Sequence, residues 1–190
     1  MDAEEVRSSA ERQFRRMKLL ADQALEQVDD RQFFHVIDPE SNSLGVIIKH
    51  VAGNLCSRWR NFLSEDGEKQ DRDRDSEFII GPQDSRDELM SNWEEGWAML
   101  FEEVSALTPG QMTDATAVIR GEAHTVTEAL HRQLSHYGYN VGQIVFLARH
   151  LCGPGWKTLS IPRGQSRRFN EEPPPYLQPG SEDDAGSVVG

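Results

Sequence analysis

A stretch of helical periodicity over residues 130–151, reading LHRQLSHYGYNVGQIVFLARHL, constrains the fold of this chain more than any other feature. The stretch contains no proline, and its apolar residues recur every three or four positions, which predicts a long amphipathic helix. Its inward face is apolar around Ile144 but carries polar side chains nearer the N-terminal end, namely Gln133, His136 and Asn140. A polar group buried without a partner costs about 1–3 kcal/mol. We therefore expect these side chains to be met by one another, by a water or by a metal.

The same periodicity predicts four long helices, over residues 4–28, 42–64, 84–107 and 125–152. Suitable N-terminal capping residues stand at three of the expected starts: Ser41 or Ser43, Asp84 or Ser85, and Thr125 with Glu128 at capping-box spacing. The Gly-Pro-Gly sequence at 153–155 ends the last helix. Four amphipathic helices joined by one long connection predict an all-α fold, a four-helix bundle.

The segments between and after these helices have different compositions. Residues 64–82 are densely charged, which is typical of a long crossover loop that is either mobile or part of the rim of a site. Residues 113–123 are short and β-branched, so a few extended residues are expected there. We predict a bundle domain over residues 1–165 and an acidic, proline-rich, extended and flexible tail over residues 166–190.

Charge and hydropathy exclude several classes of function. The chain carries 32 acidic and 20 basic residues, and this excess of negative charge argues against a nucleic-acid partner. No apolar run is long enough to span a membrane, and the N-terminus is charged and lacks a secretory core, so we expect a cytoplasmic protein. Cys56 and Cys152 fit neither a disulfide framework nor a zinc motif by their spacing, and we expect buried reduced thiols.

The predicted second helix carries its own polar residue beside an apolar stripe. His50 lies at the edge of that stripe, one turn before Asn54. Gly45 and Gly53 weaken this helix by about 1 kcal/mol each relative to alanine. We expect the glycines to allow another helix to approach closely.

These features together resemble the DinB-like superfamily, also called the YfiT-like group of metalloenzymes. The resemblance rests on Lys49 and His50 in the second helix, and on His136, Asn140, Gly142 and Gln143 in the last, where the family carries His-x-x-x-His often followed by Gly-Gln. The blocks IIKHVAGNLCSRWRNFLSEDGEK, RDSEF, IRGEAHT, GQIVFLARH and SIPRGQS resemble, more specifically, a functionally uncharacterised branch of that superfamily. The resemblance covers residues 13–170.

The resemblance implies a metal site formed by His50, His136 and position 140. The metal implied by the resemblance is zinc, nickel, iron or manganese. The family's third histidine is replaced here by Asn140, whose amide oxygen is a weak ligand for such metals compared with an imidazole. A carboxylate from the loop at 66–77 could complete the site, and Asp66 and Glu68 are the nearest in sequence. In the alternative interpretation, His50, His136, Asn140 and Gln133 simply bond to one another and to buried water.

The resemblance, with its departure at Asn140, implies two functions of different classes. The first is a metal-dependent transferase or hydrolase that acts on a small-molecule substrate, with the metal activating a low-molecular-weight thiol or a water. The second is a non-catalytic, stress-associated binding or scaffold bundle whose metal site has lost a ligand. We also expect a homodimer, as is common among DinB-like proteins, because the long helices carry several tryptophans and extra apolar positions.

Overall fold

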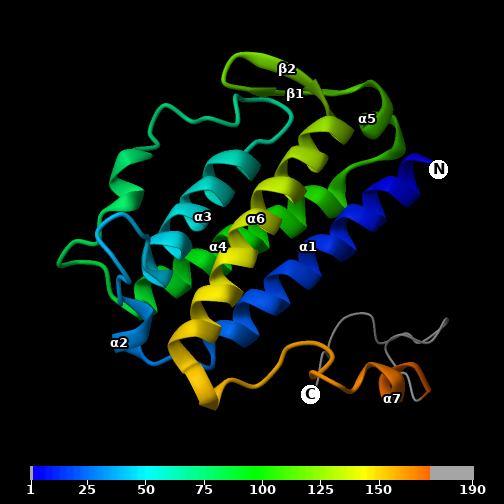
Figure 1. Ribbon diagram of the computed structural model, residues 1–190. Coiled ribbons are helices and arrows are strands. Elements are labelled where there is room, and N and C mark those ends of the chain that lie inside the picture. The colour runs from blue at the N-terminus through cyan, green and yellow to red at the C-terminus, as the bar shows by residue number, and fades with distance from the viewer. Residues whose placement is uncertain (1, 172–190) are drawn as a thin grey trace.

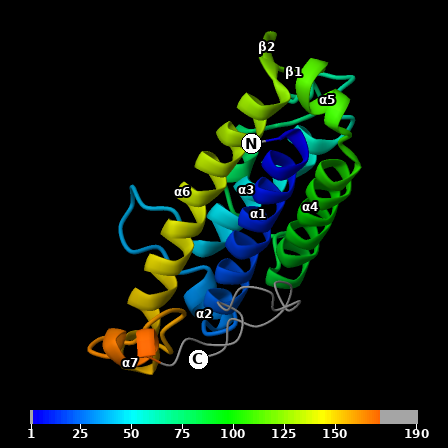
Figure 2. The same cartoon turned by 90° about the vertical axis from the view of Figure 1, so that its right-hand side faces the viewer.

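The computed structural model of the protein describes residues 2–171, and its architecture is mostly helical with one small sheet. Four long helices lie side by side (Figure 1): α1 (Ala3–Leu25), α3 (Leu44–Trp59), α4 (Arg86–Ala106) and α6 (Val126–Cys152). Each corresponds to a helix predicted from the periodicity, although α1 begins one residue earlier than expected and α1 and α3 end a few residues earlier. Figure 2 shows that α1 lies between α6 and α4.

The directions of the helices explain why the chain needs a long crossover. Helices α1 and α6 run in one direction, and α3 and α4 both run in the other (Figure 1). Because α3 and α4 are consecutive and parallel, the chain must return along the length of the molecule between them. It does so through residues 60–85, which contain a short 3-10 helix, η1 (Asp75–Phe78). The crossover predicted over residues 64–82 is thus confirmed. On its way back along the molecule, this segment passes beside α3.

Short elements lie between the long helices and after the last of them. They are α2 (Asp30–Phe33), α5 (Pro109–Asp114), β1 (Thr116–Ile119), β2 (Glu122–Thr125) and η2 (Gly153–Gly155). The strands form an antiparallel hairpin that turns through Arg120 and Gly121, both with positive φ. The extended residues expected near 113–123 are therefore present, but α5 takes up the first part of that stretch.

Local capping chemistry determines where the long helices begin. Ser43 accepts a hydrogen bond from the backbone N–H of Val46, and Ser85 does the same for Glu88. Thr125 and Glu128 form the reciprocal capping box that their spacing predicts. Of the alternatives left open by the sequence, Ser43 and Ser85 are the caps, because each stands directly before the first helical turn.

The interior is apolar and aromatic along most of its length. Trp59, Trp93 and Trp97 are completely buried, which places these tryptophans in the core and removes the reason for assigning them to a dimer interface. Within this core the Trp59 indole donates to the Tyr137 hydroxyl at 3.0 Å, and that hydroxyl donates to Asn54 Oδ1 at 3.1 Å. A buried polar chain of this kind is stable because each member has a partner.

Most of the predicted tail lies outside the residues that the structure describes. The first six residues of the expected flexible tail form a short helix, α7 (Ser166–Glu171), while the remaining tail residues 172–190 lie outside the described part of the chain. Within the described part, the helices are too short or too polar to cross a membrane.

Candidate functional site

The two histidines singled out in the sequence meet between α3 and α6. The ring centroids of His50 and His136 lie 5.5 Å apart, and both side chains line one cavity of about 170 Å³. This confirms the prediction that His50 and His136 face a common space. The cavity is also lined by five arginines, Arg58, Arg72, Arg74, Arg120 and Arg132, and by Asn54, Glu68 and Gln133.

Helical spacing explains how α3 and α6 supply much of this lining. His50, Asn54 and Arg58 follow one another at four-residue steps on α3, so they lie on one face. On α6, Arg132 and His136 stand at the same spacing. Arg58 and Arg132 could thus have been predicted from the sequence, because each lies one or two helical turns from a histidine and on the same face.

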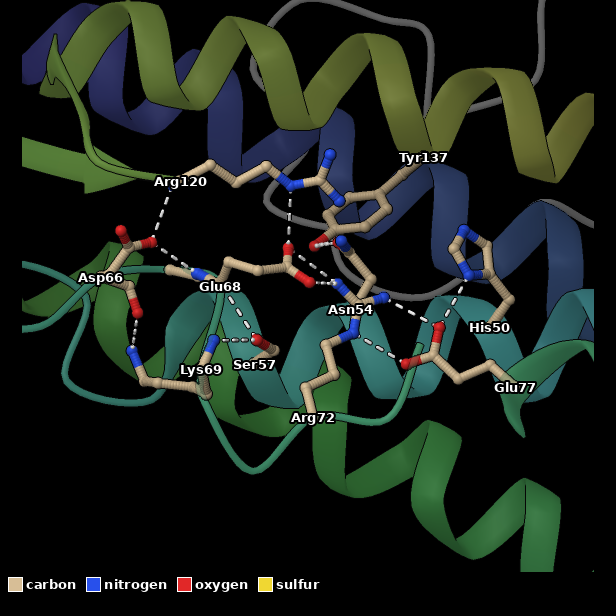
Figure 3. Close-up of polar contacts among 11 residues, drawn as sticks. His50, Asn54, Ser57, Asp66, Glu68, Lys69, Arg72, Glu77, Arg120 and Tyr137 are labelled. Carbon is tan, nitrogen blue, oxygen red and sulfur yellow. Dashed lines mark hydrogen bonds and ion pairs between the residues drawn. The ribbon is translucent and has the colours of Figure 1, made fainter. Parts of the chain in front are cut away.

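A carboxylate from the crossover loop orients the first histidine. Glu77, in η1, lies 2.8 Å from His50 Nδ1 through its Oε2 atom (Figure 3). Gly53 makes room for this carboxylate, since a Cβ atom at that position would lie 2.3 Å from Glu77 Oε1. The expected close approach at Gly53 is therefore made by a loop side chain and not by another helix. With Nδ1 occupied, the Nε2 atom of His50 is left to interact with a ligand.

Glu77 belongs to a chain of charged contacts that extends to the hairpin (Figure 3). Arg72 holds both oxygens of Glu77, at 2.7 and 2.8 Å, in a bidentate pair. The other end of Arg72 contacts Glu68 at 3.2 Å, and Arg120 contacts the same Glu68 at 3.3 Å. Burial raises the pKa of Glu77, but the hydrogen bonds from His50 and Arg72 outweigh it and hold the pKa below its usual value. The carboxylate is therefore ionised at neutral pH.

The second histidine sits in a more isolated environment. His136 Nδ1 is buried and has no hydrogen-bond partner within residues 2–171. Burial, together with the smaller effect of nearby groups that include Arg58 and other arginines, lowers the pKa of His136 to about 4. His136 is consequently a neutral imidazole at pH 7, with a ring nitrogen available to accept a hydrogen bond or to bind a metal.

Arg58 is the most deeply buried charge in the cavity. Only 4% of its surface is exposed, and its Nε and Nη1 atoms have no hydrogen-bond partner in the described chain. Gly67 admits the guanidinium, because a Cβ atom there would lie 2.4 Å from Nη1. Burial lowers the pKa of Arg58, and the nearby Arg132 and Arg72 add to this effect. A guanidinium nevertheless stays protonated, because its ordinary pKa is above 12.

Asn140, the third predicted ligand, is placed differently from the two histidines. It is buried, and its Nδ2 atom donates to the backbone carbonyl of His136 at 2.8 Å. It is not among the residues that line the cavity. The structure thus brings two of the three predicted ligands together at one cavity, and it directs the amide of the third toward its own helix.

The carboxylates expected from the crossover loop divide between two roles. Glu68 lines the cavity, as its position allowed. Asp66 instead accepts hydrogen bonds from the backbone N–H groups of Arg120 and Gly121, at 2.8 and 2.7 Å, and so ties the loop to the turn of the hairpin. Glu77, which the sequence did not single out, is the carboxylate that contacts a histidine. Its role depends on the path of the loop, for which no local signal exists.

The alternative interpretation, a polar cluster satisfied by its own members and by buried water, is not met by direct bonds between those side chains. Among residues 2–171, no hydrogen bond joins the side chains of His50, His136, Gln133 and Asn140, and Gln133 Oε1 is buried without a partner. In the same part of the chain, histidine, cysteine, aspartate and glutamate form no group of three that could hold a metal by themselves. Two imidazole nitrogens and open space remain available to a metal or another ligand.

Comparison with known proteins adds a family and nothing more specific. The family model described as "Protein of unknown function (DUF1572)" matches residues 2–165. No curated protein and no solved structure matches the chain.

Proposed function

Because the chain belongs to a family of proteins of unknown function (DUF1572) over residues 2–165, we propose its function from its own cavity: a metal-dependent enzyme of the DinB-like class. His50 and His136 would hold a divalent transition metal, zinc, nickel, iron or manganese. When bound, the metal would supply Lewis-acid chemistry to a thiol or a water for a transferase or hydrolase reaction. The observation that carries the proposal is the pairing of two imidazoles at one cavity, 5.5 Å between centroids.

The environment of each imidazole supports this assignment. Glu77 on Nδ1 of His50 is the arrangement by which carboxylates orient histidines that bind metals, leaving Nε2 for the ion. His136 is neutral at pH 7 and has an unpartnered ring nitrogen, whereas a metal cannot bind a protonated imidazole. Two protein ligands would leave coordination positions open for a substrate, as a catalytic site requires.

The position of Asn140 favours the second candidate function, a non-catalytic binding bundle. The DinB-like pattern places a third histidine there, and the Asn140 side chain bonds to its own helix and does not line the cavity. A site with two imidazoles binds transition metals more weakly than one with three. The same four helices would then form a DinB-like four-helix bundle that binds a small molecule without metal chemistry.

Metal titration distinguishes these two functions. Chelator-treated and dialysed protein should bind about one zinc or nickel ion per chain, and His136→Gln should weaken that binding by about tenfold or more. His131→Gln is the matched control, because His131 is exposed on the same helix and lies outside the cavity. Absence of saturable binding in the wild-type protein, or equal weakening by both substitutions, would eliminate the enzyme proposal and leave the binding bundle.

The replacement Asn140→His tests the third position. An imidazole one turn after His136 would restore the three-histidine pattern, and we expect zinc or nickel affinity to rise by about tenfold or more. Overpacking could cost the apo protein about 1–3 kcal/mol, which metal binding to the folded state would offset. Equal affinity in wild type and variant would show that position 140 does not reach the ion.

The homodimer and the cytoplasmic location belong to the same proposal. With the core tryptophans buried, the apolar side chains available to a partner subunit include Tyr139 and Phe146 on α6, which are 69% and 70% exposed. Light scattering at micromolar concentration checks the dimer, and a mass near that of the 21.5 kDa chain would contradict it.

A further inference from the structure

The cavity around the two histidines carries a strong local excess of positive charge. Five guanidinium groups line it, whereas the carboxylates that touch this set are Glu68 and Glu77. Between these five guanidinium groups and two carboxylates alone, the formal excess is three positive charges. The whole chain, by contrast, has a net charge of −12, so the excess reflects the convergence of particular side chains and not the general composition.

The most deeply buried part of this cluster lacks a carboxylate hydrogen-bonded to it in the described part of the chain. Arg58 is nine-tenths buried or more, lines the cavity, and has two N–H-bearing nitrogens without partners. An uncompensated buried charge is costly, and arginine cannot relieve the cost by losing its proton. The lining carboxylate, Glu68, is already shared between Arg72 and Arg120. An anion inside the cavity would supply the missing counter-charge.

The arginines are arranged from the mouth of the cavity to its base. Arg74, Arg120 and Arg132 are exposed, whereas the Arg72 side chain is only 6% exposed and Arg58 is buried. Within residues 2–171, Arg132 has no ion pair, and Arg74 contacts the ring of Phe78 without pairing with a carboxylate. Exposed cations at an opening raise the rate at which an anion enters, and buried ones hold it.

We propose that this cavity binds phosphate, as the free ion or as the terminal group of a small phosphomonoester, between Arg58, Arg72 and Arg132. The excess of three charges favours a doubly charged anion over a single carboxylate, and guanidinium groups match phosphate oxygens in geometry. A cavity of about 170 Å³ offers roughly ten times the space that one water needs, which suits a small molecule. If the protein is the enzyme proposed above, the phosphate is the charged group of its substrate. Phosphate binding itself does not require the metal.

Glu68 acts as the competitor that the ligand displaces. Its contacts with Arg72 and Arg120, at 3.2 and 3.3 Å, are longer than those between Arg72 and Glu77, at 2.7 and 2.8 Å. Its side chain is also 23% exposed, so it can swing out toward solvent. Phosphate binding would therefore leave the Arg72–Glu77–His50 contacts in place and release Glu68.

Calorimetric titration of metal-free protein with sodium phosphate tests the proposal at constant ionic strength in a chloride buffer. We expect saturable binding at one site per chain, and acetate should bind at least about tenfold more weakly. Glycerol phosphate, run in parallel, distinguishes the two sources: tighter binding than phosphate identifies an ester, and weaker binding identifies the free ion. Absence of saturable phosphate binding, or equal binding of acetate, would overturn the proposal.

Matched substitutions locate the site. Arg132→Gln should weaken phosphate binding by about tenfold. Arg149→Gln, which changes another exposed arginine of α6 that lies outside the cavity, should alter binding by less than about twofold. Glu68→Gln should strengthen binding by several-fold, because it removes the competing carboxylate. Because these three positions are exposed or half-buried, the substitutions should leave folding intact. Equal weakening by both arginine substitutions, or weaker binding in Glu68→Gln, would refute the site.

The outcomes for phosphate and for metal are independent. If metal-free protein binds phosphate and never binds zinc or nickel, the enzyme proposal fails and the anion site stands. If a metal binds but phosphate does not, the reverse holds.

Discussion

Two buried polar regions lie next to each other in this protein and differ in how their polar atoms are satisfied. In the core, Trp59, Tyr137 and Asn54 form a chain in which the indole N–H, the hydroxyl and the amide oxygen are paired. In the cavity, Arg58 and His136 carry buried nitrogens without partners. A completed hydrogen-bond chain stabilises the fold by itself, whereas an incomplete one is stable only through a water or a ligand.

The comparison is sharpened by Trp97, which also has an unpartnered indole nitrogen. This tryptophan packs against aromatic neighbours, with Tyr137 at 5.4 Å between ring centroids, and is not among the residues that line the cavity. An isolated donor in an apolar core is a modest cost. A cluster of unpartnered groups around open space, with a net charge, indicates a binding site.

The largest effect is expected in the core. Trp59→Ala should lower the free energy of unfolding by about 3–5 kcal/mol, because it removes a completely buried ring and the donor to Tyr137. Urea unfolding followed by circular dichroism measures this. A loss below about 1 kcal/mol would show that the core chain contributes less to stability than its burial implies.

Acid should destabilise the protein through the cavity. The pKa of His136 is about 4 in the folded state and about 6.5 in the unfolded state, so the unfolded chain binds more protons between these values. Stability should therefore fall as the pH is lowered from 6.5 toward 4, by an amount on the order of 3 kcal/mol. Metal-free unfolding curves across this range should show a shallower dependence in His136→Gln. An identical pH dependence in both proteins would contradict the burial of a neutral imidazole.

Tyr137→Phe should have an intermediate effect. The phenyl ring keeps the packing, but the Trp59 indole loses its acceptor and Asn54 Oδ1 loses its donor, at a cost of about 1–3 kcal/mol. Phosphate binding should remain within about twofold of wild type, since Tyr137 does not line the cavity. A large loss of phosphate binding with unchanged stability would show that Tyr137 serves the cavity and not the core.

Arg58→Met should have the smallest effect on stability. Unlike the other changes, it should not lower the free energy of unfolding. Methionine keeps the apolar length of the side chain and removes the unpartnered charge, so the free energy of unfolding without phosphate should be unchanged within about 1 kcal/mol or raised. Added phosphate should raise the melting temperature of the wild type but not of this variant. A clear destabilisation of Arg58→Met would show that the guanidinium has a structural partner.

Much of the fold could be predicted from local patterns. The four long helices, the caps at Ser43, Ser85 and Thr125, and the crossover follow from periodicity and capping chemistry, which act within a few residues. The shared cavity of His50 and His136 was also predictable. Periodicity placed each histidine near an apolar stripe, and the family resemblance implied that the two share a site. The helical turns α2 and α5 were not, since stretches this short have too little periodicity to read.

By itself, then, the sequence determined which helices form and that two histidines face inward, because both depend on residues three or four positions apart. Only the tertiary structure decided what surrounds those histidines. Glu77 reaches His50 across 27 positions, and Arg120 approaches Glu68 across 52. Such contacts depend on the path of the crossover loop and on its attachment to the hairpin through Asp66. An acidic chain can therefore enclose a cationic cavity, because composition averages over the whole surface while folding gathers particular charges into one place.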